Sequence, residues 1–304
     1  MRKNHYICMV LEGNKLMQRE LSTYAFCRGY TDIRIRSVQL PSWVDSFIFD
    51  QLGGQFLRSN ADMTVIDWNR EKILNYLGTY FPRSYAESYC IFKQILTDSQ
   101  LFCGRKMLSL LDFGCGTGGE IFGFAVALSE CRPEIKSLRV KAIDGNQFAL
   151  NRFDDIREEF NKHYPLQILS NPSAVHIEDF YDLSILDSIL ADNYDVIISF
   201  KAVCEFVTKQ QFEEKNAYEH LSKFMLPRVS KQGTMLLVDV TSKNNVSQEW
   251  LPTMMDRGLA AAGASVISRN RGHNETFTVS HSKQVGDISR IAWRLIGPQN
   301  TENK

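Results

Sequence analysis

Three glycines at alternate positions follow an apolar run and an acidic residue. The segment 110–118 reads LLDFGCGTG, which places Asp112 ahead of Gly114, Gly116 and Gly118. Glycine suits a tight turn in which the backbone takes unusual φ and ψ values and approaches a ligand with no Cβ atom in between. The pattern therefore predicts a strand, a turn and a helix that hold a nucleotide-like ligand.

A second acidic residue ends the next expected strand. A helix is expected from Glu120 to Glu130, and the apolar segment 138–143 leads into Asp144. A carboxylate at this place can accept hydrogen bonds from the two vicinal hydroxyls of a ribose. An acid before Gly145 is also ordinary turn chemistry. The order of loop, helix and acid favours the ribose interpretation.

The spacing of the glycines separates two classes of ligand. A dinucleotide fingerprint reads Gly-x-Gly-x-x-Gly and sets a helix N-terminus against a pyrophosphate. Here the pattern is Asp-x-Gly-x-Gly-x-Gly. The acid would repel a pyrophosphate, but it could order the loop or receive an ammonium group directly or through water. The expected ligand therefore carries a ribose and a cationic amine.

With these motifs the chain resembles the class I S-adenosylmethionine-dependent methyltransferases over roughly residues 83 to 296. The resemblance implies that the cofactor loop comprises Asp112, Gly114, Gly116 and Gly118, that Asp144 holds the ribose, and that Asp179 and Phe180 meet the adenine. It also implies that segment 194–200 is the fourth strand, whose end at Ser199 lies beside the methyl-bearing sulfur. Asp179 also reads as loop chemistry, for which Glu178 competes, and Phe180 also reads as core.

Candidate catalytic residues follow that fourth strand. Lys201 and Glu205 are four residues apart, so they could share a helical face and orient an acceptor or act as a base; the alternative is a solvated ion pair or a helix cap. His273 and His281 could each act as a base near neutral pH, although lone histidines are commonly loop or surface residues. An Asn/Asp-Pro-Pro-aromatic motif is missing here, which argues against methylation of exocyclic DNA amino groups or glutamine.

Alternating strand-like and helix-like segments predict an α/β fold, and the resemblance implies a Rossmann-like, seven-stranded, mostly parallel sheet with helices on both faces. Strands are expected at 108–112, 138–143, 174–177, 194–199 and 234–240, and three short ones within 264–296 that include an antiparallel pair. Helices are expected at 83–98, 118–130, 146–161, 210–229 and 249–262. Residues 1–82 are expected to form a mainly helical extension, as a cap over the cleft or an accessory layer; 83–296 form the methyltransferase domain, and 297–304 a flexible tail.

Composition limits the remaining choices. The chain has 304 residues, is 44% hydrophobic, and balances 35 Lys and Arg against 35 Asp and Glu, so no global field attracts nucleic acid or an anionic membrane. Its seven cysteines include no Cys-x-x-Cys pair, so reduced thiols are expected and no metal site. With no apolar run of membrane length, a soluble, cytoplasmic protein is expected.

A narrower resemblance concerns a methyltransferase-like family associated with the small subunit of mitochondrial and bacterial ribosomes. It rests on segments 80–86, 204–206 and 257–264, but that family's C-terminal cysteine cluster is missing because no cysteine follows Cys204. Neither that metal site nor a ribosomal role carries over.

The expected cofactor is S-adenosyl-L-methionine. Three interpretations of the function stay open. The neutral chain slightly favours a small or medium molecule. The rival is RNA, in particular ribosomal RNA, with local bases at Arg269, Arg271, Lys283, Arg290 and Arg294. The third interpretation is a non-catalytic assembly protein that keeps the cofactor as a structural part.

Overall fold

A sheet of 11 strands runs through the computed structural model, which describes residues 29–57, 69–191, 193–207, 211, 215–244 and 247–298. Its spatial order is β1-β9-β11-β8-β7-β3-β4-β5. The parallel centre consists of β3 (Met107–Phe113), β4 (Ser137–Asp144), β5 (Gln167–Ser170), β7 (Tyr194–Phe200) and β8 (Val229–Val240). The remaining strands are β1 (Gly29–Tyr30), β2 (Ser37–Gln39), β6 (Ser173–Ala174), β9 (Val266–Arg269), β10 (Glu275–His281) and β11 (Gln284–Ile296).

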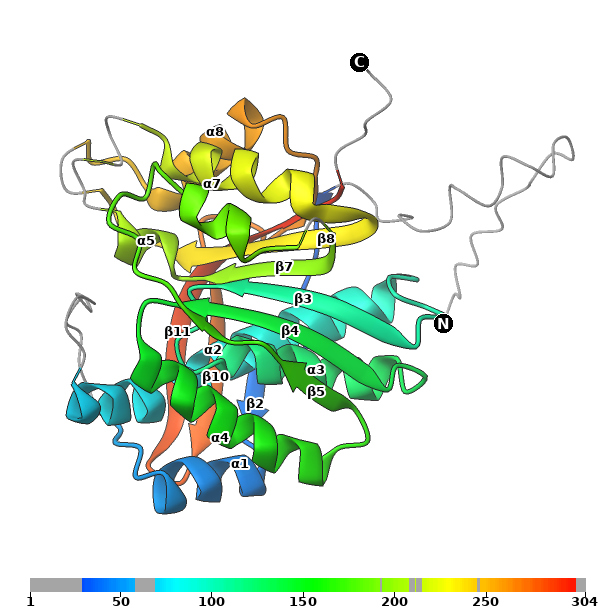
Figure 1. The fold of residues 1–304 in the computed structure, drawn as a ribbon, viewed down its shortest axis with the longest axis vertical. Helices are drawn as coiled ribbons and strands as arrows, with labels where there is room; N and C mark the ends of the chain where they lie inside the picture. The colour runs from blue at the N-terminus through cyan, green and yellow to red at the C-terminus, as the bar shows by residue number, and fades with distance from the viewer. Residues whose placement is uncertain are drawn as a thin grey trace, which may run out of the picture.

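Helices cover both faces of this sheet (Figure 1). One face carries α1 (Ser42–Ser46), the turn η2 (Phe47–Gln51), α2 (Arg70–Asp98), α3 (Gly119–Cys131) and α4 (Gln147–His163). The other carries η3 (Ser184–Ser188), α7 (Ala217–Met225), η4 (Leu226–Arg228) and α8 (Leu251–Ala261), with α5 (Val203–Phe206) after β7. Every residue of β7 is buried, as expected of a parallel strand covered on both sides. The predicted α/β class is confirmed.

The chain order creates a switch point at the carboxyl ends of β3 and β7. From β3 the chain proceeds through α3 to β4 and through α4 to β5 on one side, whereas β7 and β8 lie on the other side of β3. The strand order therefore reverses between β3 and β7. In an open α/β sheet, a crevice for ligands lies at such a reversal. The glycine turn follows β3, and Lys201 follows β7.

The long helix α2 begins well before the predicted start at 83. The Asn69 side chain caps it by accepting a hydrogen bond from the Lys72 amide (3.0 Å), and Pro82 lies inside it. Its packing on α3 depends on glycines, because a Cβ atom at Gly119 would lie 2.5 Å from the Phe81 carbonyl oxygen. This close approach of two helices stabilises a helix that proline would otherwise break.

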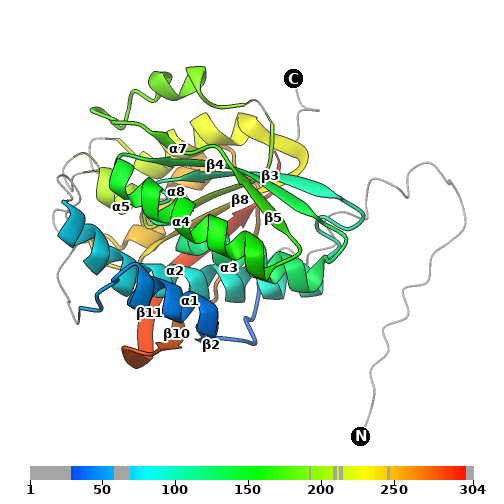
Figure 2. The same cartoon turned by 60° about the horizontal axis from the view of Figure 1, so that its bottom comes forward.

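The described part of the predicted extension shares its core with the rest of the chain. Strand β2 pairs with β10 and β1 with β9, both in parallel, and Ile33, Leu40 and Ile48 belong to the same apolar cluster as α2 and α3. Figure 2 shows α1 beside the β10–β11 hairpin, where Asp45 accepts hydrogen bonds from Ser282. Helix α2 also continues across residue 82, the predicted boundary. Residues 1–28, 58–68 and 299–304 of the predicted extension and tail lie outside the described residues.

Seven strands was the wrong number, because short strands at the edges are not apparent from sequence periodicity. The third parallel strand was expected at 174–177, but β5 occupies 167–170 and only the two-residue β6 follows it. Within the helix expected at 210–229, α7 ends at Met225, the 3-10 turn η4 with Pro227 follows, and β8 starts at Val229. The predicted antiparallel pair is confirmed as β10 and β11. No helix in the described ranges is long and apolar enough to cross a membrane.

Candidate functional site: an acidic recess around the glycine turn

The glycine turn between β3 and α3 has the conformation that its residue types predict. Gly114, Gly116 and Gly118 have φ values of 76°, 50° and 80°, in the left-handed region that residues with a Cβ atom rarely adopt. The amides of Gly114 and Cys115 both donate to the Ile143 carbonyl oxygen, at 2.9 and 3.0 Å. The turn is therefore anchored to the end of the neighbouring strand β4.

Asp144 braces this turn from the end of β4. One carboxylate oxygen accepts from the Gly116 amide at 2.7 Å and the other from the Asn146 amide at 2.8 Å, while Asn146 itself caps α4. Burial raises the pKa of Asp144 and these backbone hydrogen bonds oppose the rise. The predicted ribose ligand thus also orders the loop, and with a further backbone hydrogen bond from Gly145 the carboxylate keeps part of its acceptor capacity for a ligand.

Four acidic side chains lie around the turn and are called the acidic recess below: Asp112, Glu120, Asp144 and Glu205. Asp112 is the most deeply buried of the four. It is fully buried, and within the described parts of the chain neither of its oxygens has a hydrogen-bond donor. Its carboxyl group interacts with that of Glu120, which is 3% exposed. Burial, and then the negative charge of Glu120 and Asp144, raises the pKa of Asp112 well above its usual value. Burial raises the pKa of Glu120 too, so the pair retains a proton near neutral pH.

Further polar atoms around the turn are buried and, among the described residues, unsatisfied. They include the hydroxyls of Thr117 in the turn and Ser199 at the end of β7, and Oε1 of Glu87 on α2. The other Glu87 oxygen accepts a hydrogen bond from Lys201 Nζ at 2.8 Å. Buried polar groups without partners are costly, so a polar ligand at the site would stabilise them.

The prediction that Lys201 and Glu205 share a helical face is wrong. Lys201 lies before α5 with a left-handed φ of 58°, and α5 begins only at Val203. Its ammonium group pairs with Glu87 instead of Glu205. A non-glycine residue in this conformation is strained, which is common in residues at functional sites.

Glu205 nevertheless belongs to the recess electrostatically. Its side chain is exposed to solvent, and the protein groups near it partly desolvate the carboxyl group. Desolvation, and then the charges of Asp144 and Asp239, raise the pKa of Glu205 to about 8, and Lys201 opposes this rise. A carboxyl group of this kind can exchange a proton near neutral pH.

The other predicted site residues lie in different settings. Asp179 is exposed and accepts from the Tyr181 amide at 2.9 Å, which orders its own loop. Phe180 is 2% exposed and lies edge-on to Phe113, with 6.5 Å between ring centroids. His273 is exposed, and its ring packs edge-on against Trp250 at 4.2 Å. His281 is buried against Phe49, in the contact between β10 and η2.

Sequence reasoning missed Tyr76, Glu87 and Glu120, of which the first two come from α2. Tyr76 lies over the turn, and a Cβ atom at Gly116 would be 2.6 Å from its hydroxyl oxygen. Burial raises the pKa of Tyr76 well above its usual value, and the charges of Glu205, Glu120 and Asp144 add to the rise. Glu120 could have been found from its place as the second residue of the helix that follows the turn. Tyr76 and Glu87 carry no local signal, because only packing brings α2 to the turn.

The recess carries more negative than positive groups. Asp112, Glu120, Asp144 and Glu205 influence one another's pKa values, and Lys201 is the cation that acts on Glu120 and Glu205. Within the described segments no group of three or more His, Cys, Asp or Glu side chains has the arrangement to hold a metal ion. Such a recess repels pyrophosphate and suits an organic cation that also offers hydroxyl groups.

Comparison with known proteins gives similarity at the level of solved structures. No protein-family model matches the chain, and no curated protein matches it in sequence. Similar folds occur in magnesium protoporphyrin IX methyltransferase from Synechocystis with bound SAM (14% identity, TM-score 0.43, 83% of this chain and 94% of that chain). They also occur in precorrin-6y C5,15-methyltransferase from Geobacter metallireducens (12%, 0.41, 70% and 89%) and a SAM-dependent methyltransferase from Aquifex aeolicus (15%, 0.38, 71% and 98%). These structural neighbours are methyltransferases, but likeness at these identities and TM-scores carries no argument about function.

Proposed function

We propose that the chain is an S-adenosylmethionine-dependent methyltransferase whose cofactor lies in the acidic recess. The observation that carries this proposal is the set of buried polar atoms around a left-handed glycine turn, including both Asp112 oxygens, that have no hydrogen-bond partner among the described residues. A sulfonium nucleoside with an amino-acid tail brings an ammonium group, a second positive charge and two ribose hydroxyls. The carboxyl groups and the hydroxyls of Thr117 and Ser199 suit these groups.

Each predicted cofactor residue has a role in this proposal. The turn Gly114, Gly116 and Gly118 presents backbone to the ligand, and Asp112 with Glu120 receives the ammonium group directly or through water. Asp144 receives the ribose hydroxyls with its remaining lone pairs. Asp179 and Phe180 contact the adenine in this proposal, and Ser199 lies beside the sulfur.

When bound, the cofactor supplies a methyl group on a sulfonium, an already activated electrophile. The protein then has to hold the acceptor close, aligned and shielded from water. Among Lys201, Glu205 and His273, we favour Glu205 as the group that takes a proton from the acceptor. Lys201 is engaged by Glu87, and the His273 ring packs edge-on against Trp250.

A small-molecule acceptor fits the surface better than RNA. Four of the five basic residues that the sequence offers for RNA binding pair with acids in the structure. These pairs are Arg269–Asp256, Arg271–Asp32, Lys283–Asp50 and Arg294–Asp256, and the Arg294 side chain is 4% exposed. The buried Arg294 is withdrawn from RNA phosphates and shares Asp256 with Arg269, whereas the exposed pairs of Arg271 and Lys283 are weak.

Calorimetric titration with S-adenosylmethionine and, separately, NAD tests the proposal. We expect S-adenosylmethionine to bind and NAD not to. Asp112→Asn should weaken S-adenosylmethionine binding at least tenfold without lowering the melting temperature, because it replaces the acid that would receive the ammonium group with an uncharged amide of the same shape. Asp182→Asn in an exposed loop is the control. Preference for NAD, or no binding by the wild type, would remove the proposal.

Turnover needs a separate measurement, because binding alone also fits the non-catalytic alternative. Methyl-labelled cofactor is incubated with the protein and a cell extract, which is then fractionated by molecular size. We expect label in the small-molecule fraction. Cofactor binding without any transfer would favour the assembly-protein interpretation, and label in RNA would favour the RNA acceptor.

A further inference from the structure

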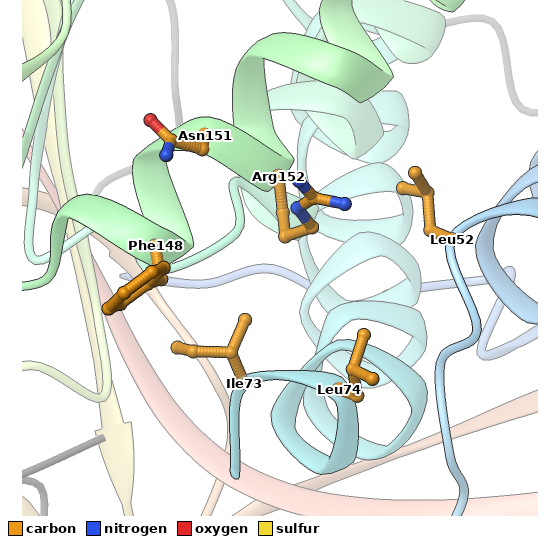
Figure 3. Close-up of a pocket in the computed structure, with 6 residues that line it drawn as sticks. All are labelled: Leu52, Ile73, Leu74, Phe148, Asn151 and Arg152. Atoms are coloured by element: carbon orange, nitrogen blue, oxygen red, sulfur yellow. The ribbon is translucent and has the colours of Figure 1, made fainter. Parts of the chain in front are cut away.

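A pocket of about 310 Å³ opens between the first turns of α2 and α4. Figure 3 shows Ile73 and Leu74 on α2, Phe148, Asn151 and Arg152 on α4, and Leu52 on the segment after η2. The Arg152 side chain extends from α4 between Phe148 on one side and Leu52 on the other (Figure 3). This volume is at the low end of the range for small-molecule sites, and it is too small for a folded partner.

The lining combines an apolar wall with one cation. Ile73 is 2% exposed and is a buried residue of the wall. Phe148, in the first turn of α4, is 54% exposed. An exposed phenylalanine beside a pocket offers a flat face on which another ring can stack. Among the lining residues that the structure describes, Arg152 carries the only charge.

Arg152 has donors left for a ligand. It pairs with Asp155, one turn further along α4, through a single nitrogen at 3.0 Å, and the two side chains are 32% and 41% exposed. A guanidinium group has five N–H donors, and an exposed pair of this kind is weak. An incoming carboxylate or phosphate could therefore bind this cation without breaking a strong interaction.

Two of the residues that line the pocket are close in the chain to residues that contact the glycine turn. Ile73 precedes Tyr76 by three residues on α2, a rise of about 4.5 Å, and Tyr76 lies over Gly116. Phe148 donates its amide to the Asn146 side chain at 2.9 Å, and the Asn146 amide donates to Asp144. The pocket is thus next to the glycine turn along both α2 and α4, through Tyr76 and through Asn146 with Asp144.

We propose that this pocket binds the methyl acceptor, a small molecule with a flat apolar body and one anionic group. The inference rests on the proposed function above. Phe148 and Ile73 contact the apolar body, and Arg152 receives the anionic group. Since the recess is acidic, the anion is held on the side of the pocket that carries Arg152, and the uncharged part of the acceptor is directed to the recess.

Naphthalene-2-carboxylate and the neutral naphthalene-2-carboxamide serve as matched probes, with binding measured by ligand-observed NMR. We expect the carboxylate to bind the wild type more tightly than the amide. Arg152→Gln should weaken carboxylate binding about tenfold and leave the amide unchanged, while Phe148→Ala should weaken both. Arg157→Gln is the control, because Arg157 lies on the same helix and pairs with Asp154 at 2.9 Å and Glu158 at 3.3 Å, but does not belong to the lining of the pocket.

The same titration with saturating S-adenosylhomocysteine assigns the pocket. Unchanged or tighter carboxylate binding supports an acceptor site beside the cofactor. Competition overturns the inference, because the probe would then occupy the cofactor's place, and so does equal loss in Arg152→Gln and Arg157→Gln. Cofactor affinity is measured on each variant in parallel. If the wild type binds cofactor but not the probe, only this inference fails; if it does not bind cofactor, the proposed function fails first.

Discussion

The hydroxyl oxygen of Tyr76 lies 2.6 Å from the place that a Cβ atom would take at Gly116. A residue of the long helix α2 thus covers the turn that follows β3, although the two are forty positions apart in the chain. Gly116 is required for two reasons, because its φ is +50° and because the tyrosine ring leaves no space for a side chain. The cover and the turn form one unit.

Replacing Gly116 with alanine should affect binding more than stability. The left-handed φ costs about 1–2 kcal/mol for a residue with a Cβ atom, and the Tyr76 ring has to shift. Gly104→Ala is the matched control, because its φ is +75° and nothing lies within 4 Å of the new Cβ. Gly116→Ala should lose more stability than Gly104→Ala in urea unfolding, because the Tyr76 ring also has to shift, and only Gly116→Ala should lose at least tenfold in S-adenosylmethionine affinity. Equal affinities in the two variants would contradict a ligand at this turn.

Binding of a cation should release protons from the recess. Burial raises the pKa of Glu120 and of Glu205 to about 8. Each carboxyl group is therefore protonated in most molecules at pH 7. A cationic ligand favours the charged form, so its affinity should rise as pH increases from 6 to 8. Calorimetry in buffers with different ionisation enthalpies measures the released protons, and Glu205→Gln should reduce their number. Net proton uptake on binding would show that the sign is wrong.

The buried pair of Lys201 and Glu87 should be important for stability. Glu87 is fully buried, and its Oε2 accepts a hydrogen bond from Lys201 Nζ at 2.8 Å. Lys201→Met leaves a buried carboxylate without its counter-charge, at a cost of about 3–5 kcal/mol in urea unfolding. The double variant with Glu87→Gln should recover part of this loss. Lys223→Met is the control, since the Lys223 side chain is 59% exposed, and should cost less than about 1 kcal/mol.

His281 should make the fold less stable in mild acid. It is 3% exposed, neither ring nitrogen has a partner among the described residues, and it stacks on Phe49. Burial lowers the pKa of His281, with Asp287 and Asp45 opposing and Arg83 adding to the shift. The neutral form therefore stabilises the fold fully above the unfolded-state pKa of about 6.5, and this contribution is lost as pH falls through the lower folded-state pKa.

Thermal unfolding between pH 7.5 and 5 measures this effect. We expect a smaller drop in melting temperature for His281→Phe than for the wild type. His176→Gln, at an exposed position, is the control and should follow the wild type. A wild-type slope in His281→Phe would mean that another group is responsible.

The conformation of the glycine turn and the place of its two acids follow from residue type alone. Left-handed glycines, the acid that precedes them and the acid at the end of β4 are set by residue type within a short segment, because turn geometry allows few alternatives. Strand β7 was apparent because a parallel strand covered on both faces is mostly apolar, and β3 and β4 because apolar residues lead directly into the turn acids Asp112 and Asp144.

The side chains around that turn are brought there by packing between distant segments. Tyr76 and Glu87 reach it because Gly119 and Gly123 let α2 approach α3 closely, with a Cβ atom at Gly123 placed 2.3 Å from the Tyr85 carbonyl oxygen. Lys201 left the expected helical face because a left-handed backbone turned its side chain to Glu87. The short edge strands were set by partners far away in sequence. Contacts of this kind depend on non-local packing, which local periodicity and residue type do not encode.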